Sequence, residues 1–585
     1  MDFSDEQLAV INAPLHPMAV VACAGSGKTQ TAVRRLAEIR KRLGEHRGRV
    51  ALLSFSNVAV NTFRTNYQAL ERELPVGFGR NRVEIDTLDG FITSNVLRPH
   101  GPRTMKCPRT PFLVSGNEPF LRNKDYNFWV QATAADVFPV QPPDLGKVII
   151  NVRAGIASFH FQQHRMLLPI NNGIKAATNL AATGAYTHNL GRYWVYRVLA
   201  EQPNVLRALS RRYPHILIDE AQDIGTLHQE ILEMLIKAGS HVSLIGDPNQ
   251  SIYDFAGANG QFLAEYGHRL GVTPYGLTRN YRSVPLILSL ANTLGQRRDV
   301  ANRTAPLTPH GAFFVTYKNA ERDTLIETFN AAIAAASLEV GKSAVLCRGR
   351  DLADELAGRD AAIGQGAVKL LARAAIHRDR QQNYLDAFKL VAWSIVGLLA
   401  DPPEGLVSRI TQPSQYPDMA ALRRVIWRYT RSSETGLPSA ELPASSQWHE
   451  LLVARTKALL TDLDKKFELK SAPNLGNKLS KKALPASPLV SGDDLVADGR
   501  RKLRIDTVHQ AKGESLDAVL YLATKDHVLS LIAGANTELG RIGYVAATRA
   551  KNLLWLGVPA NSAAELRPTL LKMGFEEIGA PLKKG

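Results

Sequence analysis

Cysteine is scarce in this chain of 585 residues, which contains only Cys23, Cys107 and Cys347. Three widely separated cysteines offer neither a disulfide framework nor a paired-cysteine metal site. They also exclude an iron–sulfur cluster, which needs a group of cysteine ligands. The sequence therefore suits a reducing compartment, and we expect a cytoplasmic protein.

Long apolar runs are absent as well. The longest, Leu390–Ala400, is far shorter than the ~20 residues that a membrane-spanning helix needs, and it predicts a buried helix. The acidic first residues, Met1–Glu6, lack the basic and apolar regions of a secretory leader. We therefore expect no membrane association. No repeat of fixed period is present, which excludes a solenoid.

Acidic residues are outnumbered by basic ones: 54 Asp and Glu stand against 71 Lys and Arg, and the net charge is +17. Hydrophobic residues make up 45% of the chain and charged residues 21%, which excludes a disordered or collagen-like protein. A basic surplus of this size indicates a polyanionic partner, most often a nucleic acid. The alternative is a basic surface that only favours solubility.

Short apolar segments alternate with stretches of helical periodicity in two parts of the chain. In the first part, Val20–Ala22, Val50–Phe55, Ile216–Ile218 and Val242–Ile245 are expected to be buried strands. A second such pattern begins near residue 277. Alternating strands and helices predict parallel sheets covered by helices. The strands expected in the second part lie within 341–350, 504–506, 518–522 and 553–557.

Each of these α/β units is interrupted by an insertion. Residues 96–190 are rich in proline, asparagine and aromatic residues, then helical in pattern, without a strand–loop–helix unit. Residues 361–500 are mostly helical in pattern, with two expected flexible breaks at Ser432–Ser446 and Leu484–Gly492. The predicted fold class is α/β, with two parallel-sheet domains, each interrupted by a mainly helical insertion.

A phosphate-loop pattern, ACAGSGKT, lies between an expected strand and an expected helix. Gly25 and Gly27 permit backbone N–H groups to turn toward phosphate oxygens. Lys28 can neutralise the β- and γ-phosphates of ATP, and the hydroxyl of Thr29 can bind Mg²⁺. The alternative is a chance glycine-rich turn. The nucleotide-binding residues predicted in this loop are Ala22, Cys23, Ala24, Gly25, Ser26, Gly27, Lys28 and Thr29.

An acidic segment, DEAQD, follows the strand expected at Ile216–Ile218. Asp219 at the end of that strand can hold Mg²⁺, and Glu220 can orient or deprotonate the attacking water. An acidic cluster after a strand is more commonly a solvated turn. The phosphate loop in the same chain favours the catalytic interpretation.

Six motifs, in order, resemble those of the superfamily 1A DNA helicases of the UvrD/Rep type. Two of them are the phosphate loop and DEAQD at 219–223. The others are GDPNQSIYDFAGA at 246–258, NYR at 280–282, TVHQAKG at 507–513 and YVAATRA at 544–550. The resemblance implies two RecA-like motor domains with ATP and Mg²⁺ between them, and movement along single-stranded or forked DNA from 3′ to 5′.

The resemblance also implies roles for single residues at the matching positions. Gln7 is expected to contact adenine, and Tyr281 to stack on it. Gln250 is expected to sense the γ-phosphate. Glu514 is either the ribose-binding carboxylate or that contact is absent, because the family's KGLE is KGES here. The catalytic set implied is Lys28, Asp219, Glu220, Gln250 and two arginine fingers, Arg282 and Arg549.

The two insertions fall where the family has its 1B and 2B subdomains, and the second is short for the family. Expected segments are motor domain 1A at 1–95 and 191–276, insertion 1B at 96–190, motor domain 2A at 277–360 and 501–585, and a reduced insertion 2B at 361–500.

Four residues are expected to contact single-stranded DNA by the same resemblance. Tyr253 and Phe255 could stack on bases, at ~1–3 kcal/mol per base. Thr87 and His509 could contact phosphates. The alternatives are core aromatic rings and polar groups that are satisfied inside the protein.

Several positions depart from the family pattern. Gln30 stands where the family has arginine, Asp89 would repel phosphate, and the segment Phe255–Gly257 lacks the family's guanidinium. Residues 86–99, DTLDGFITSNVLRP, resemble the helicase subunit of the Gabija anti-phage system, which works with a separate OLD-type ATP-dependent nuclease. Because the residues after Ala550 are too few for a nuclease domain, we expect such a nuclease as a partner.

Two other functions stay open: a DNA-activated ATPase that acts as a sensor without unwinding, and a housekeeping DNA repair helicase. A phosphate-loop kinase or small-molecule NTPase is disfavoured by the two arginine fingers and the charge of +17.

Overall fold

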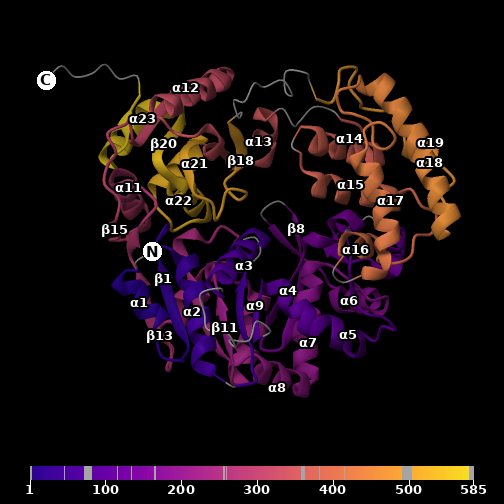
Figure 1. Ribbon diagram of the computed structural model, residues 1–585, viewed down its shortest axis with the longest axis horizontal. Coiled ribbons are helices and arrows are strands. Elements are labelled where there is room, and N and C mark those ends of the chain that lie inside the picture. The colour runs from indigo at the N-terminus through magenta and orange to yellow at the C-terminus, as the bar shows by residue number, and fades with distance from the viewer. Residues whose placement is uncertain are drawn as a thin grey trace.

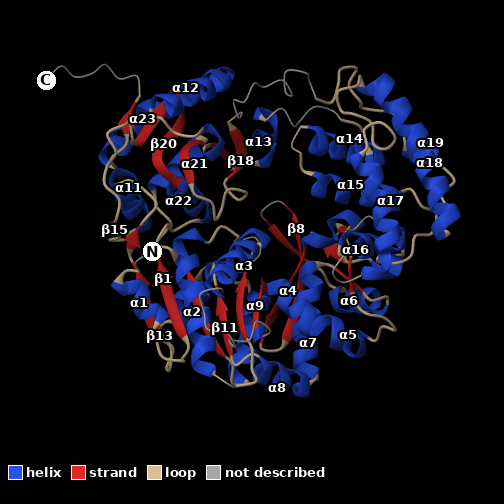
Figure 2. Ribbon diagram, viewed as in Figure 1, coloured by secondary structure: helices blue, strands red, loops and turns tan. Residues whose placement is uncertain are grey.

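Two six-stranded sheets, one in each α/β unit, form the framework of the protein (Figures 1 and 2). All neighbouring strands in both sheets are parallel, which confirms the predicted α/β class with two parallel-sheet domains. The computed structural model describes residues 3–44, 46–71, 82–114, 116, 118–133, 135–163, 166–253, 257–258, 260–357, 363–380, 382–413, 416–490 and 503–578.

The first sheet has the strand order β13-β1-β12-β11-β2-β3. Alternate residues of β2 pack into two different cores, Val50 and Leu52 on one face and Ala51 and Leu53 on the other, so both faces are covered. The four expected strands are present. The strands are β1 (Met18–Ala22), β2 (Val50–Ser54), β3 (Val83–Thr87), β11 (His215–Ile218), β12 (His241–Gly246) and β13 (Thr273–Leu277). The helices are α1 (Asp5–Ile11), α2 (Lys28–Leu43), α3 (Asn57–Glu71), α8 (Pro203–Arg212), α9 (Thr226–Lys237) and α10 (Gln261–Tyr266).

The second sheet has the order β18-β17-β19-β20-β16-β21, and the four strands expected in this unit are among them. The strands are β16 (Gly311–Tyr317), β17 (Ala344–Cys347), β18 (Arg504–Thr507), β19 (Leu516–Leu522), β20 (Ala550–Pro559) and β21 (Glu576–Glu577), with a separate pair β14 (Arg279–Asn280) and β15 (Val300–Ala301). The helices are α11 (Pro285–Gly295), α12 (Arg322–Ala335), α13 (Arg350–Leu356), α21 (Lys525–Ile532), α22 (Glu538–Arg549) and α23 (Ala560–Lys572).

The first insertion is mixed, so the expectation of a mainly helical segment is wrong for it. Within the described part of residues 129–169, the regular elements are antiparallel strands and a short 3-10 helix. In β7, Val148, Ile150 and Val152 are buried and alternate with more exposed residues, a period of two that specifies a strand. Its strands are β4 (Phe112–Leu113), β5 (Trp129–Gln131), β6 (Val137–Pro139), β7 (Val148–Arg153), β8 (Ile156–Gln163), β9 (Met166–Pro169) and β10 (Ala185–Tyr186). Its helices are α5 (Arg98–Met105) and α6 (Gly173–Ala182); α4 (Leu88–Ile92) lies just before it, and α7 (His188–Glu201) begins at its end.

The second insertion is helical and has its own core around the fully buried Trp448. The break expected to be flexible at Ser432–Ser446 is instead packed: Leu437 and Ala440 are fully buried, and the guanidinium of Arg378 donates to the Leu437 carbonyl. The second expected break is described only up to residue 490. The helices are α14 (Gly366–Asp379), α15 (Tyr384–Gly397), α16 (Leu406–Thr411), α17 (Ala420–Arg431), α18 (His449–Phe467) and α19 (Leu475–Lys478).

The two α/β units lie one above the other on the left of Figure 1, and the second insertion lies on the right above the first insertion. α16 docks on the first insertion, where Ser408 Oγ donates to the Leu113 carbonyl over 2.8 Å and Arg109 pairs with Glu404 at 2.8 Å. Each α/β unit therefore carries an insertion, and the two insertions contact each other. None of the described helices has the length and apolar character required to cross a membrane.

Candidate active site

The phosphate-loop motif joins β1 to α2, as the sequence predicts. Gly25 and Gly27 have φ angles of +75° and +77°, a left-handed conformation that favours glycine. A Cβ on Gly25 would also collide with the Cβ of Arg282 in the second α/β unit. Lys28 is the first residue of α2, so the loop ends at a helix N-terminus, where backbone N–H groups attract anions.

The NYR segment of the second unit holds this loop. The side chain of Asn280 donates to the Ala24 carbonyl over 2.6 Å, and the backbone N–H of Tyr281 donates to the Gly25 carbonyl over 2.9 Å. The loop is therefore a contact point between the two α/β units. Tyr281 lies beside it, and its stacking on adenine stays a prediction.

Gln7 supports the loop from α1. Its side-chain nitrogen donates to the Ser26 carbonyl over 3.1 Å, and its side-chain oxygen accepts from the Ser4 backbone N–H in a capping box. The next residue toward the N-terminus, Glu6, accepts from the backbone N–H groups of Thr278 and Arg279, where the chain passes from the first unit to the second. Sequence reasoning missed Glu6, because a single acidic residue in the first turn of a helix carries no signal of its own. The predicted contact of Gln7 with adenine stays untested.

The two acidic residues after β11 lie in a buried, highly charged environment. Burial, and then the neighbouring Glu220, raise the pKa of Asp219 to about 7. One of its side-chain oxygens, Oδ1, is buried without a hydrogen-bond partner. A buried carboxylate oxygen without a partner fits a hard cation, so Asp219 suits Mg²⁺, which prefers oxygen ligands.

Glu220 adopts a left-handed conformation with φ +56°, which non-glycine residues rarely take. Burial alone would raise the pKa of Glu220, but Lys28, Lys512 and the side-chain hydrogen bond from Gln222 together lower it. An ionised carboxylate at this position can accept a proton from water.

Arg282 and Arg549 approach the phosphate loop from the second unit. Arg282 donates to the Thr548 carbonyl over 2.9 Å. Arg549 is fully buried and donates to the Val545 and Glu514 carbonyls. Burial and then Arg549 lower the pKa of Arg282 to about 9, and burial lowers that of Arg549. Both cations are thus desolvated, and Arg549 lies close enough to Arg282 to repel it.

Gln250 connects the two units. Its side-chain nitrogen donates to Asp247 Oδ2 over 2.8 Å, and its side-chain oxygen accepts from Arg549 Nη2 over 2.8 Å. Asp247, at the end of β12, is fully buried. Gln250 therefore lies beside Arg549, and its sensing of the γ-phosphate stays a prediction.

A buried ion pair also joins the units: Lys512 Nζ lies 2.5 Å from Asp223 Oδ2, and both side chains are at most 7% exposed. The same ammonium group lies 4.7 Å from the centre of the Tyr253 ring. Tyr253 also contacts the ring of His509, whose Nε2 is 3.1 Å from the Ile252 carbonyl. Two of the predicted DNA-contacting residues are therefore neighbours.

The other predicted DNA contacts are not brought together with these. Thr87 is the N-cap of α4, and its Oγ1 accepts from the Gly90 N–H over 2.9 Å. Phe255 lies outside the described residues.

Glu514, the predicted ribose-binding residue, pairs with Arg504 at 2.6 Å, and its side chain is about one-third exposed.

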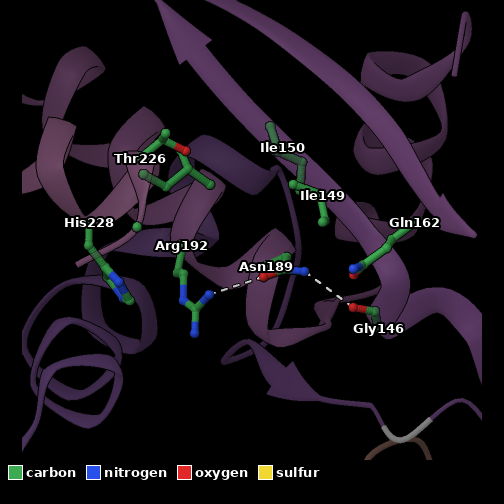
Figure 3. Close-up of a pocket in the computed structure, with 10 residues that line it drawn as sticks. Gly146, Ile149, Ile150, Gln162, Asn189, Arg192, Thr226 and His228 are labelled. Carbon is green, nitrogen blue, oxygen red and sulfur yellow. Dashed lines mark hydrogen bonds between the residues drawn. The ribbon is translucent and has the colours of Figure 1, made fainter. Parts of the chain in front are cut away.

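Asp89, the departure that would repel phosphate, is neutralised inside the protein. It accepts two hydrogen bonds from Arg192 and lies 2.8 Å from His228 Nε2. These partners lower its pKa far below the usual value against the opposing effect of burial. Arg192 and His228 line a cavity of about 250 Å³ between the first insertion and α9 (Figure 3). None of the lining residues in Figure 3 is a predicted site residue.

Two family models match the chain in order. The UvrD/REP helicase N-terminal domain matches residues 3–132 and 176–270, and the UvrD-like helicase C-terminal domain matches residues 419–560. Together they cover more than half of the chain. The chain belongs to the UvrD-type helicases of superfamily 1A.

Proteins with similar sequences are described as DNA helicases. ATP-dependent DNA helicase UvrD2 of Mycobacterium tuberculosis is 25% identical over 313 residues, which are 49% of this chain and 42% of the relative. DNA helicase II of Haemophilus influenzae is 27% identical over 308 residues, 50% of this chain and 40% of the relative. DNA helicase II of Escherichia coli is 25% identical over 308 residues, which are 50% of this chain and 40% of the relative. The match therefore spans less than half the length of these relatives.

Proposed function

We propose that this chain is an ATP-dependent DNA helicase that moves along single-stranded DNA. One observation carries the proposal. Arg282 lies against the phosphate loop at Gly25, and Arg549 lies close to Arg282. The hydrogen bonds that they donate within the described residues go to carbonyl groups, a hydroxyl and the amide of Gln250. Within the same residues neither guanidinium has a carboxylate ion-pair partner. Two desolvated cations that lack a carboxylate ion-pair partner and lie at the phosphate-loop side of the second unit suit the phosphates of ATP.

The residues of the first unit would hold ATP at its phosphates. The N–H groups of the loop and of the first turn of α2 face the phosphate oxygens, and Lys28 adds a positive charge. Asp219 and Thr29 would hold Mg²⁺, which when bound neutralises the β- and γ-phosphates. Glu220, kept ionised by its cationic neighbours, would orient the attacking water and take its proton.

The second unit would complete the site. Arg282 and Arg549 would stabilise the charge that develops as the γ-phosphoryl group is transferred. Gln250 would transmit the presence of that group, because it binds Arg549 on one side and lies close in sequence to Tyr253 on the other. Tyr253, His509 and Lys512 would form part of the DNA-binding surface beside it.

The test of this proposal is ATP turnover with and without single-stranded DNA. We expect DNA to stimulate turnover and Lys28→Ala to lower it by at least about 100-fold, as for removal of one transition-state contact. Lys41→Ala, an exposed residue of the same helix, is the matched control and should leave turnover unchanged. Unchanged turnover in a folded Lys28→Ala protein would contradict the proposal.

We further propose movement from 3′ to 5′, on the resemblance to the UvrD/Rep type. Unwinding of partial duplexes with either a 3′ or a 5′ single-stranded tail tests the direction. Only the 3′-tailed duplex should be separated. DNA-stimulated turnover without unwinding of either substrate would favour the sensor ATPase instead.

We also propose a role in anti-phage defence beside an OLD-type nuclease. The support is the resemblance of residues 86–99 to the Gabija helicase subunit. Purification of the tagged chain from its native cells at low salt, followed by identification of bound proteins, tests this role. Recovery with DNA repair proteins and without a nuclease would favour a housekeeping repair helicase.

A further inference from the structure

Arg297 of the second unit reaches Asp247 of the first. It lies in the segment after α11, outside the six motifs, and its side chain is only 14% exposed. Its Nη1 is 3.8 Å from Asp247 Oδ1. Its Nε and Nη2 donate to the two carboxylate oxygens of Asp299 over 2.7 and 3.0 Å. One guanidinium group thus lies between two buried carboxylates.

The position of Arg297 is fixed by the backbone around it. Gln296, which caps α11, has a φ angle of +51°. The Asn292 side chain donates to the Asp299 carbonyl over 2.9 Å and accepts from the Asp299 N–H over 3.0 Å. The Arg297 N–H donates to the Asn292 carbonyl over 2.9 Å. This short segment is therefore a defined turn, held against α11, which packs beside α22 (Figure 1).

The carboxylate of Asp247 in turn fixes the amide of Gln250. Because an ionised carboxylate only accepts hydrogen bonds, it requires the nitrogen of the amide to face it. The amide oxygen then faces Arg549 Nη2, which only donates. The orientation of Gln250, and with it the place of Arg549, depends on where the Asp247 carboxylate lies.

We propose that Arg297 is a positioning residue for ATP hydrolysis, which holds Asp247 and through it aligns Gln250 with Arg549; the inference rests on the proposed function. Four charged side chains follow one another along this path and alternate in sign: Asp299, Arg297, Asp247 and, through the Gln250 amide, Arg549. Loss of Arg297 would leave two buried carboxylates facing each other without the cation between them. Their repulsion would displace Asp247 and the amide that it holds.

The test compares kcat and KM for ATP at saturating single-stranded DNA. Arg297→Ala should lower kcat by about 10- to 100-fold, the loss typical of a small misplacement of a catalytic group, with KM changed less than about threefold. Arg567→Ala is the matched control in the same unit, because Arg567 pairs with Glu577 at an exposed position. It should leave both constants unchanged.

Two further variants separate positioning from folding. Arg297→Lys keeps the charge without the forked geometry and should lose less kcat than Arg297→Ala. The double variant Arg297→Ala/Asp299→Asn removes one carboxylate together with the cation, and it should recover at least about fivefold of the loss in kcat. If Arg297→Ala does not fold, kcat of the double variant and kcat of Arg297→Lys are each compared with kcat of the wild type instead.

Unchanged kcat in Arg297→Ala, beside an active wild type, would overturn this inference alone. A double variant with the same or a lower kcat than the single variant would also overturn it. An inactive wild-type protein would instead contradict the proposed function, and this inference with it.

Discussion

Arg282 and Arg549 are both desolvated, and Arg549 lies close enough to Arg282 to lower its pKa; an anion bound between them would offset that repulsion. Arg282→Ala and Arg549→Ala should each lower kcat about 10²- to 10⁴-fold with a smaller effect on ATP affinity, because the charge that they offset grows in the transition state. Single-turnover hydrolysis and equilibrium binding of ATP measure the two effects separately. Arg567→Ala serves again as the control. Variants that only weaken ATP binding would identify both residues as ground-state ligands.

Asp219 should make the stability of the nucleotide-free protein depend on pH. Its pKa is raised from 3.8 to about 7 in the folded protein, so between these values the folded state binds a proton that the unfolded chain releases. The free energy of unfolding therefore falls as pH rises across this range. Asp219→Asn should remove that decrease and stabilise the protein at pH 8 by roughly 1–3 kcal/mol. Urea unfolding at pH 5 and pH 8 measures it, and equal curves for both proteins at pH 8 would contradict it.

Much of the site was predictable from the sequence, because its chemistry is carried by contiguous motifs. Lys28 and Asp219 follow directly from a strand–loop–helix pattern and a strand end. Glu6 and Arg297 were not predicted, because their partners lie far away in the chain; Asp247 lies inside one of the six motifs, but the motif alone assigns it no role. An isolated arginine in a polar turn gives no signal until the fold places a buried carboxylate beside it.

At the scale of elements, the residue before α4 has two possible roles, one in capping the helix and one in binding DNA. Thr87 caps this helix, and the resemblance makes the same residue a DNA contact. Thr87→Ala should cost about 0.5–2 kcal/mol of stability through the lost cap, while Thr87→Ser keeps the hydroxyl and should cost little. Thermal unfolding measures the cap, and single-strand binding of the folded variants measures the contact. A stability equal to that of the wild type in Thr87→Ala would contradict the capping role.

The elements of the two sheets were easier to predict than those of the first insertion. Central strands such as β2 and β11 are fully buried and mostly apolar, so length and composition identify them. Most strands of the first insertion are short and antiparallel, and several hold polar or proline residues, as β6 does with Pro139. β3 and β13 are partly exposed edge strands of the first sheet with a similarly weak pattern. Whether such a segment forms a strand depends more on pairing with other strands in the fold than on its local sequence.

At the scale of the whole molecule, the two α/β units meet through charged groups as well as through the phosphate loop. The Lys512–Asp223 pair, the Asp247–Arg297 pair and the Gln250–Arg549 hydrogen bond all cross between the units. Breaking one member of a buried pair leaves an uncompensated charge. A change in the spacing of the units is therefore coupled to the arrangement of the catalytic groups.

The net charge of +17 belongs to the whole chain, and we expect it to strengthen the proposed binding of DNA. A protein that covers single-stranded DNA releases condensed counterions, so the logarithm of the binding constant should fall linearly with the logarithm of salt concentration. For about four to eight phosphate contacts, the slope should be roughly −3 to −6. Fluorescence anisotropy of a labelled oligonucleotide between 50 and ~300 mM salt measures it, with Lys28→Ala as a control that should keep the slope. A slope near zero would mean that the basic surplus serves solubility and that stacking on rings such as Tyr253 dominates binding.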